Sequence, residues 1–580
     1  MIKTKIICTI GPAVDDPDVM RQLIAGGVDV ARMNFSHGTH EEHLKRLNQF
    51  RALCAELGQN IPVLLDTKGP EIRTGSFSSG DIEIIEGQSF TLTTQEIDGD
   101  STRAHVNYKG LPGDLSPKDC ILIDDGLVKF EVVSIDGSEI NCVALNDGVI
   151  GGKKSVNVPG ISLNLPALTQ KDKDDLLFAI ANDYDFIAVS FVRKKDDVTD
   201  VRRFVDEHDG GAIRIISKIE CREGIDNLDE IILVSDGLMI ARGDLGVEIP
   251  VEEIPAAQKA MIKRCHYAGK NVITATQMLD SMMRNPRPTR AEVTDIANAI
   301  YDGTSAIMLS GETASGKYPV ESLRTMKRIA QTTESSIKYW KRFTNHDHSD
   351  KTSSVSYAIS HATCTTAMDL NASVIVAVTA SGHTAREISG FRPACPIVAA
   401  TTNQKALMQL RLSWGVYPVL VDVVESTDDL FNVAVESARE SGMVSDGDII
   451  VVTAGVPVGI SGTTNMLKVQ MVGNILCHGV GIGTKLAGGP LCVVGHDAEA
   501  YAFERGNVLA IDEITDALLP IIRQCTALIV AGNDKDGKAE ALAKVLEIPI
   551  ITGAAGATSL LKPGTVVSVD AASGIIQCIE

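Results

Sequence analysis

The sequence has little of several features that mark particular classes of protein. Aromatic residues are only 4% of its 580 residues, and its twelve cysteines include no CxxC pair and no zinc-ligand spacing. Scattered thiols of this kind indicate reduced cysteines rather than a disulfide framework. No apolar run is long enough to span a bilayer, and Met1–Lys5 leads directly into a strand pattern. We therefore expect a cytoplasmic protein with neither a signal peptide nor a membrane anchor.

The sequence also lacks an excess of basic residues. Its net charge is −21, which argues against a general nucleic-acid or anionic-membrane surface. An anionic substrate would therefore need a local cationic pocket or a bound metal. The rest of the composition is that of a globular protein, with 44% hydrophobic and 22% charged residues, and the 50 glycines suit many tight turns.

Eight short apolar runs recur in the first 340 residues, and amphipathic stretches separate them. The runs are Lys5–Ile10, Asp29–Phe35, Pro62–Asp66, Phe186–Phe191, Ile213–Ile219, Gly237–Ala241, Asn271–Thr276 and Ser305–Ser310. Eight strands, each followed by a helix, are typical of a closed (β/α)8 barrel of the TIM type, an α/β fold. Active sites of such barrels lie at the carboxyl ends of the strands.

Charged and hydroxyl side chains gather where these runs end. Lys218 and Glu220 are two residues apart, so they share one face of the fifth strand, and Asp244 follows the sixth. Two carboxylates can hold a hard cation, and a lysine can neutralise an oxyanion. A salt bridge inside the barrel is the competing interpretation, but polar residues recur at the same depth elsewhere. These are Arg32, Asn34, Ser36, Asp66, Arg242 and Thr276.

The remaining sequence divides into further domains. Short alternating runs between Gly, Asp and Asn turns predict a small inserted β domain, a β-barrel lid, at 70–163. The catalytic barrel would then comprise 1–69 and 164–340. A second α/β pattern predicts an open, mostly parallel sheet at 341–472, and 473–580 forms a separate small C-terminal domain.

Five segments make this chain resemble the pyruvate kinase family. They are Thr4–Pro12, Ala31–Gly38, Asp66–Gly75, Met239–Pro250 and Thr274–Leu279. The segments occur in the family's order, and the resemblance covers roughly residues 1–470. One departure is Cys221, which follows Glu220 where the family usually has a small polar or basic residue. Because that position flanks the expected metal site, the departure bears on fine tuning rather than on activity.

The resemblance implies transfer of phosphate from phosphoenolpyruvate to ADP, giving pyruvate and ATP in the last step of glycolysis. Glu220 and Asp244 would hold Mg²⁺ or Mn²⁺, and main-chain N–H groups of Arg242–Asp244 would bind the substrate carboxylate. The predicted catalytic residues are Lys218, which would stabilise the phosphoryl group, Thr276, which would orient or relay a proton, and Arg32. The predicted substrate-binding residues are Arg32, Lys218, Arg242, Gly243, Asp244 and Thr276.

The same resemblance implies a monovalent cation and a nucleotide site. Asn34, Ser36, Asp66 and Thr67 would ligate K⁺, although each residue alone more often caps a helix or a turn. Glu71 supports K⁺ dependence, since family members with lysine at this place carry their own cation. The residues expected to bind the nucleotide are His37, Arg73 and Lys154, the last reaching in from the inserted domain.

A regulatory site is implied in the second α/β domain. Thr379, Ser381, Gly382 and Thr384 follow an apolar strand and open a helix, a pattern that suits an anion but is common in strand-to-helix turns. By resemblance this is the phosphate loop for an allosteric effector, a sugar phosphate or nucleoside monophosphate, with Gly455–Asn465 as the companion loop. The resemblance also implies a homotetramer.

The C-terminal domain resembles the phosphohistidine swivelling domain of phosphoenolpyruvate-using enzymes. Gly488–Pro490, Glu547–Gly553 and Val569–Asp570 carry this match. In phosphotransfer versions a Thr-Ser-His triplet precedes the helix, but here the stretch is Asp536–Lys538, without histidine. We therefore predict that this domain carries no phosphate.

Two other functions compete with a kinase. A metal-dependent aldolase or lyase acting on pyruvate enolate would also use paired Glu and Asp, but it would not need the K⁺ ligands, the lid lysine or an ADP site. A non-catalytic regulator on a similar barrel would be expected to have lost Lys218 or Asp244, and both are present.

Overall fold

The structure is a computed structural model, and it divides the chain into two compact units. It describes residues 2–344 except 79, then 354–423, 426–445, 447–455, 464–473, 475–495 and 503–579. The first unit contains Met1–Ser354 and Thr379–Asp422, and the second contains Val355–Val378 and Val423–Glu580.

The first unit contains a closed barrel of eight parallel strands, which confirms the predicted fold class. The strands are β1 (Lys5–Thr9), β2 (Val30–Asn34), β3 (Val63–Asp66), β12 (Phe186–Val189), β13 (Arg214–Ile219), β14 (Gly237–Ala241), β15 (Asn271–Ala275) and β16 (Ala306–Leu309). Sequential strands are neighbours, and β1 closes the ring against β16. Every barrel strand is almost wholly buried, so each appears in the sequence as a short continuous apolar run.

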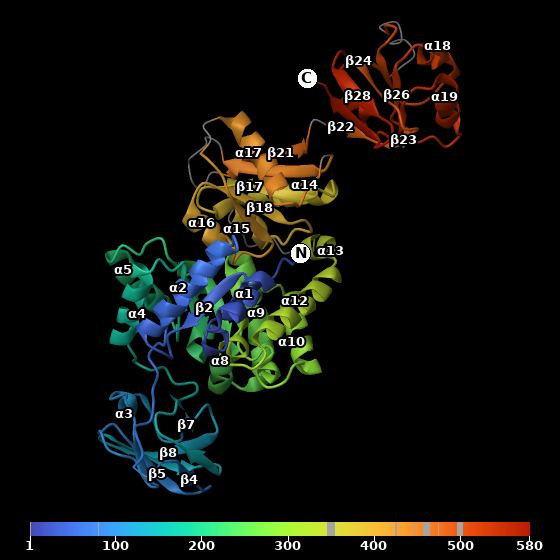
Figure 1. Ribbon diagram of the computed structural model, residues 1–580. Helices are drawn as coiled ribbons and strands as arrows, with labels where there is room; N and C mark the ends of the chain where they lie inside the picture. The colour runs from blue at the N-terminus through green and yellow to red at the C-terminus, as the bar shows by residue number, and fades with distance from the viewer. Residues whose placement is uncertain are drawn as a thin grey trace. The chain divides into compact units, whose positions relative to one another are not determined.

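Helices form an outer layer around these strands (Figure 1). The main ones are α1 (Pro17–Gly26), α2 (His40–Glu56), α4 (Gln170–Ala181), α5 (Lys195–Glu207), α7 (Leu228–Val234), α9 (Ile254–Ala268), α10 (Arg290–Asp302) and α12 (Pro319–Ser335). Several begin with a capping box, in which a threonine accepts a backbone N–H and an acidic residue three positions later reaches back. Thr39, Thr169 and Thr289 act in this way. Short helices follow three of the barrel strands: α6 (Arg222–Asp226), α8 (Arg242–Glu248) and α11 (Gly311–Ala314). A further short helix, α13 (Tyr339–Thr344), follows α12.

The segment inserted after β3 is rich in strands, as predicted. A six-stranded sheet has the order β11 (Val156–Asn157), β7 (Cys120–Ile123), β8 (Val128–Asp136), β9 (Glu139–Ala144), β5 (Ser89–Thr93) and β6 (Arg103–His105). A two-stranded sheet pairs β10 (Gly148–Ile150) with β4 (Ile82–Ile84), and one short helix, α3 (Leu111–Asp114), interrupts the strands. The insert has a hydrophobic core of its own, which includes Phe90 and Phe130.

The second α/β pattern is shared between the units. In the first unit, β18 (Ile397–Thr401) pairs in parallel with β19 (Val416–Leu420), next to α15 (His383–Gly390) and α16 (Gln404–Leu410). In the second unit, β17 (Val374–Val378) pairs in parallel with β20 (Ile449–Gly455), which pairs antiparallel with β21 (Thr464–Met471). Its helices are α14 (Val355–Asp369) and α17 (Thr427–Glu440).

The C-terminal part of the second unit is an eight-stranded sheet with short helices. Its strand order is β22 (Ile475–His478), β29 (Ile575–Cys578), β28 (Val566–Asp570), β24 (Leu486–Val494), β25 (Val508–Ile511), β26 (Ala527–Val530), β27 (Ile550–Thr552) and β23 (Val480–Ile482). The helices are α18 (Leu519–Ile522), α19 (Lys538–Leu546) and α20 (Ala557–Leu560). None of the helices within the described residues combines the length and apolar character that a membrane crossing needs.

Candidate active site

Lys218 is the centre of a buried charge cluster at the carboxyl ends of the barrel strands. Its Nζ lies 2.9 Å from Asp66 Oδ1 on β3 and 2.9 Å from Glu220 Oε1, and it donates to Ser190 Oγ at 2.6 Å. Burial alone would lower the pKa of the ammonium, but the surrounding carboxylates outweigh burial and raise it above its ordinary value. Lys218 is therefore a fixed cation.

Glu220 and Asp244 are carboxylates whose charges are incompletely balanced. Burial raises the pKa of Glu220; Lys218 opposes this rise, and the charge of Asp244 adds to it. Asp244, on α8, lines the pocket. Burial raises the pKa of its carboxyl group; Lys218 opposes this rise, and the negative charge of Glu71 adds to it. Two carboxylates that both resist ionisation are suited to a cation.

The structure brings two other predicted strand-end residues, Arg32 and Asp66, into this cluster. Arg32 on β2 donates from Nε to Asp66 Oδ2 at 2.7 Å and from Nη1 to Thr9 Oγ1 at 2.9 Å. Asp66 therefore lies between two cations, and Arg32 and Lys218 overcome burial to lower its pKa. The set Arg32, Lys218 and Asp66 forms one continuous network across β2, β3 and β13.

The four predicted K⁺ ligands lie on two neighbouring strand ends. Asn34 on β2 is in register with Asp66 on β3, and the Phe35 N–H donates to the Asp66 carbonyl at 2.9 Å. Asn34 Oδ1 accepts the Ser36 N–H at 3.1 Å, while the Thr67 carbonyl accepts the Ser190 hydroxyl at 2.7 Å. The set consists of oxygen-bearing side chains and carbonyls, the ligand type that hard cations prefer.

Thr276 lies in a strained turn that follows β15. Its φ is 65° and that of Gln277 is 53°, so both residues are in the left-handed region, which residues other than glycine rarely adopt. The Thr276 hydroxyl accepts the Gly243 N–H at 2.8 Å and donates to the Ala275 carbonyl at 2.7 Å. This N–H, predicted to bind substrate, contacts Thr276 in the structure.

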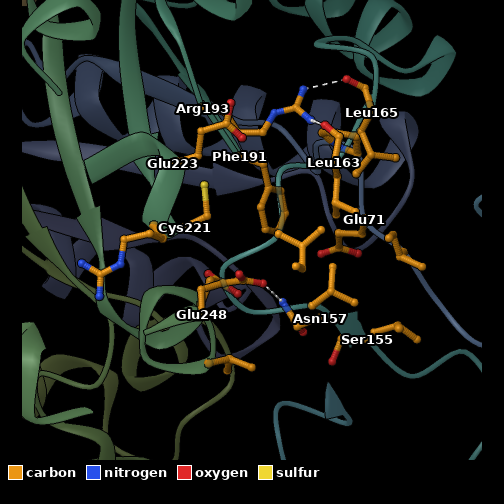
Figure 2. A pocket seen from close by; sticks show the side chains of 18 of the residues that line it. Glu71, Ser155, Asn157, Leu163, Leu165, Phe191, Arg193, Cys221, Glu223 and Glu248 are labelled. Atoms are coloured by element: carbon orange, nitrogen blue, oxygen red, sulfur yellow. Dashed lines mark hydrogen bonds between the residues drawn. The ribbon is translucent and has the colours of Figure 1, made fainter. Parts of the chain in front are cut away.

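A pocket of about 520 Å³ opens between the inserted domain and the barrel. Asp244 and two of the predicted nucleotide residues, His37 and Arg73, line it; Figure 2 shows other lining residues. Arg73 Nε is 2.7 Å from Glu71 Oε2, so Glu71 already has a cationic partner. The third predicted nucleotide residue, Lys154, is not among the lining residues, and its Nζ pairs with Asp124 Oδ2 at 2.9 Å.

Hydrogen bonds across this pocket join the inserted domain to the barrel. Asn157 Nδ2 donates to Glu248 Oε1 on α8 at 2.7 Å, and Arg193 donates to the Leu163 and Leu165 carbonyls at 2.7 Å each (Figure 2). At the entry to the insert, Gly69 has φ 73°, and a Cβ there would lie 2.8 Å from the Cβ of Ser190. The chain is therefore tightly packed against the barrel where the insert begins.

Three site residues were missed by the sequence analysis. Ser190 bridges Lys218 and the Thr67 carbonyl. Glu312 accepts the Leu279 and Ser310 N–H groups at 2.9 and 2.7 Å, and thus holds the loop after Thr276. The Ser310 hydroxyl is buried, and none of the described residues bonds to it. Ser190 and Ser310 each lie just beyond a barrel strand, the one signal that could have identified them.

The predicted effector residues form a compact turn in the first unit. The Gly382 N–H donates to Thr379 Oγ1 at 3.0 Å, and Gly382 has φ 78° immediately before α15. Ser381 and Thr384 belong to the same turn. In the companion loop, residues 456–463 lie outside the described residues.

No cluster of three or more His, Cys, Asp or Glu side chains with metal-binding geometry occurs among the residues that the structure describes. Among those residues, then, no metal site is formed by three or more such side chains. A site with only two protein carboxylates, such as Glu220 and Asp244, is compatible with this finding. Mg²⁺ commonly takes only one or two protein carboxylates and fills its other positions with water and substrate oxygens. The donor set therefore fits Mg²⁺ bound together with a phosphorylated substrate.

Three family models match successive parts of the chain. They describe a pyruvate kinase barrel domain at residues 1–323, a pyruvate kinase alpha/beta domain at 357–470, and the mobile domain of PEP-utilising enzymes at 503–574. The last match agrees with the resemblance seen in the C-terminal sequence.

Known proteins that are similar to this chain are also pyruvate kinases. A pyruvate kinase from Sporosarcina psychrophila is 45% identical over 579 residues, covering 99% of both chains. One from Clostridium acetobutylicum is 50% identical over 473 residues, which are 81% of this chain and 100% of the relative. The solved pyruvate kinase of Cryptosporidium parvum has a TM-score of 0.78 and 40% identity, covering 81% of this chain and 96% of that one. This chain belongs to the pyruvate kinase family.

Proposed function

We propose that the Lys218 cluster transfers the phosphoryl group of phosphoenolpyruvate to ADP. The observation that carries this proposal is a buried ammonium in contact with Asp66 and Glu220, with Asp244 nearby, at the active-site end of a closed barrel. The P–O bond to the enol oxygen breaks, a β-phosphate oxygen of ADP forms the new P–O bond, and the enolate takes a proton at C3.

The chain's own residues account for most of this chemistry. Lys218 stabilises negative charge on the phosphoryl group, and Arg32 contacts the substrate from the end of β2. The turn that includes Gly243 and Asp244 orients the carboxylate. Thr276 positions the water that delivers the proton, because a threonine hydroxyl alone is a weak acid.

Cations complete the proposed site. Glu220 and Asp244 would hold Mg²⁺, or Mn²⁺, which when bound supplies positive charge to the phosphoryl oxygens. Asn34, Ser36, Asp66 and Thr67 would hold K⁺. Support for both sites comes from the oxygen ligands described above and from the unbalanced carboxylates Glu220 and Asp244.

The inserted domain acts as a lid over the pocket, excluding water from the enolate and ADP. His37 and Arg73 contact the nucleotide, and Lys154 joins them if it leaves Asp124 when the lid closes. The contact between Asn157 and Glu248 supports a lid that can reach α8. Small-angle scattering profiles that are identical with and without Mg²⁺ and a substrate analogue would contradict this motion.

Regulation and assembly belong to the same proposal. A phosphorylated metabolite would bind Thr379, Ser381, Gly382 and Thr384, and the chain would form a homotetramer in the cytoplasm, where glycolysis takes place. The C-terminal domain would carry no phosphate, because Lys538 starts α19 where phosphotransfer versions have histidine. Recovery of a phosphohistidine from this domain would contradict the last point.

The first test measures ATP formation from phosphoenolpyruvate and ADP with Mg²⁺, with K⁺ present or replaced by tetramethylammonium. We expect activity that requires K⁺. Activity without K⁺ would leave the reaction standing but contradict the role given to Glu71. Absence of ATP formation, even with sugar phosphates or AMP added, would contradict the proposed function and favour the aldolase or regulator alternatives.

A further inference from the structure

The guanidinium of Arg242 acts as a clamp on the turn that carries Thr276. Its Nε donates to the Ala275 carbonyl at 3.1 Å, and its Nη2 donates to the Thr276 carbonyl at 2.7 Å. The side chain is only 10% exposed, so these bonds are largely shielded from water. Although Arg242 was predicted to bind substrate, its side chain is occupied in holding the end of β15.

The turn needs such a clamp because its backbone is strained. Thr276 is β-branched and still adopts a left-handed conformation, as does Gln277 next to it. Strained residues of this kind persist only where surrounding contacts over-determine them. The N–H of Gly243, the guanidinium of Arg242 and the carboxylate of Glu312 provide those contacts.

Asp295 on α10 binds the guanidinium of Arg242 through both carboxylate oxygens. Arg242 Nη1 lies 2.8 Å from Asp295 Oδ1 and 2.7 Å from Oδ2, and Gln258 Oε1 is a longer contact at 3.4 Å. Asp295 is the one carboxylate paired with Arg242 within the described residues. The planar guanidinium thus joins three elements, α8, the end of β15 and α10, and Asp295 determines its direction.

We infer that Asp295 is a positioning residue for the proton transfer to the enolate, acting through Arg242 on the Thr276 turn. The inference rests on the proposed role of Thr276. Asp295 does not line the pocket, so it has no substrate to contact there. An ordinary surface ion pair would affect activity little, because such pairs are weak and replaceable.

The test compares Asp295→Asn with Asp229→Asn. Asp229 is also a helical aspartate paired with an arginine, Arg264, at 3.1 Å, and both partners are well exposed. Both substitutions remove one carboxylate charge from an Arg–Asp pair, so Asp229→Asn is the matched control. A third variant, Asp295→Glu, restores the charge and the acceptor oxygens.

Two rates are measured for each full-length variant: kcat and KM for ATP formation, and exchange of the pyruvate methyl hydrogens with D₂O in the presence of Mg²⁺, K⁺ and ATP. For Asp295→Asn we expect kcat and exchange to fall together at least tenfold, with KM for phosphoenolpyruvate within threefold of wild type. Asp295→Glu should recover at least a third of both rates, and Asp229→Asn should stay within twofold of wild type.

Several outcomes would overturn the inference. Asp295→Asn with both rates within twofold of Asp229→Asn would do so, as would a fall in kcat without a fall in exchange. If Asp295→Asn does not fold, Arg242→Lys replaces it, and wild-type exchange in that variant overturns the inference. A wild-type chain that forms no ATP contradicts the proposed function instead, so the two failures are distinguishable.

Discussion

Strands β13 and β14 carry charged side chains at both ends, and the two ends differ. At the amino ends, Asp236 accepts from Arg214 at 2.5 Å, from Arg202 at 2.9 Å and from the Ile215 N–H at 2.9 Å. Despite burial, these partners lower the pKa of Asp236. At the carboxyl ends, burial raises the pKa of both Glu220 and Asp244 although Lys218 is close.

At the ends of these two strands, the pKa shift of Asp236 is therefore opposite in direction to the shifts of Glu220 and Asp244. Asp236 has two arginines and a backbone N–H as partners, so its network stabilises the fold. Glu220 and Asp244 share the charge of Lys218, which also pairs with Asp66, and raised carboxylate pKa values of this kind are common where a ligand binds. The two ends of the same strands provide matched substitutions to test this difference.

The largest effect on kcat is expected from substitution of Lys218. Lys218→Met should lower kcat about a thousandfold, because it removes the buried cation that we propose stabilises the phosphoryl group. Arg214→Met is the control, since it removes a cation from the other end of β13; the folded enzyme should keep kcat within threefold. Similar losses of kcat in both variants, measured by ATP formation, would contradict the proposed division between the two ends.

The next largest effect is expected on Mg²⁺ binding at Glu220. In the wild type, Mg²⁺ at about a hundred times its Kd should add about 3 kcal/mol to the stability and raise the midpoint of thermal unfolding. Glu220→Gln should lose this shift and lower kcat/KM about a hundredfold. Asp236→Asn should retain the shift. Calorimetry with and without EDTA measures it, and a shift that survives in Glu220→Gln would contradict the assignment.

A smaller effect is expected at the amino ends. Asp236→Asn should cost about 2 kcal/mol at neutral pH, because it breaks charge-assisted bonds to two arginines. Since the folded-state pKa of Asp236 is lowered, its contribution is complete above the ordinary aspartate range and is lost as pH falls through the lowered value. The difference in unfolding midpoint between wild type and variant should therefore shrink below about pH 4. A difference that stays constant down to pH 3 would contradict the ion-pair explanation.

The smallest effect is expected from removing the C-terminal domain. Truncation after residue 472 should change kcat less than twofold, because the proposed chemistry lies at the barrel strand ends. The Clostridium acetobutylicum relative, which aligns over its full length with 81% of this chain, supports this expectation. A larger loss in the folded truncated enzyme would show that the site depends on more than the barrel and its lid.

Much of the barrel could be predicted from the sequence because its strands are buried on both faces. Each strand is therefore a short apolar run, and Lys218 and Glu220 stand out within one of them. By contrast, β21 was not predicted. It pairs antiparallel with β20, and its exposed and half-buried residues produce no apolar run.

The supporting residues of the site were harder to predict. Ser190 follows β12 with no charge to mark it, and Asp295 lies within an amphipathic helix where an aspartate is ordinary. Their importance comes from contacts with residues 28 and 53 positions away along the chain. Such contacts depend on how the loops fold over the barrel, which periodicity alone does not reveal.

Gly69, where the chain enters the inserted domain, packs closely against Ser190 of the barrel. Its φ of 73° suits glycine, and an added Cβ would meet Ser190 at 2.8 Å and the Phe191 ring at 3.0 Å. Ser190 in turn contacts the Lys218 ammonium. A single methyl group at position 69 would thus push on the side chain that contacts Lys218, so the path of the chain into the insert and the position of the lysine depend on each other.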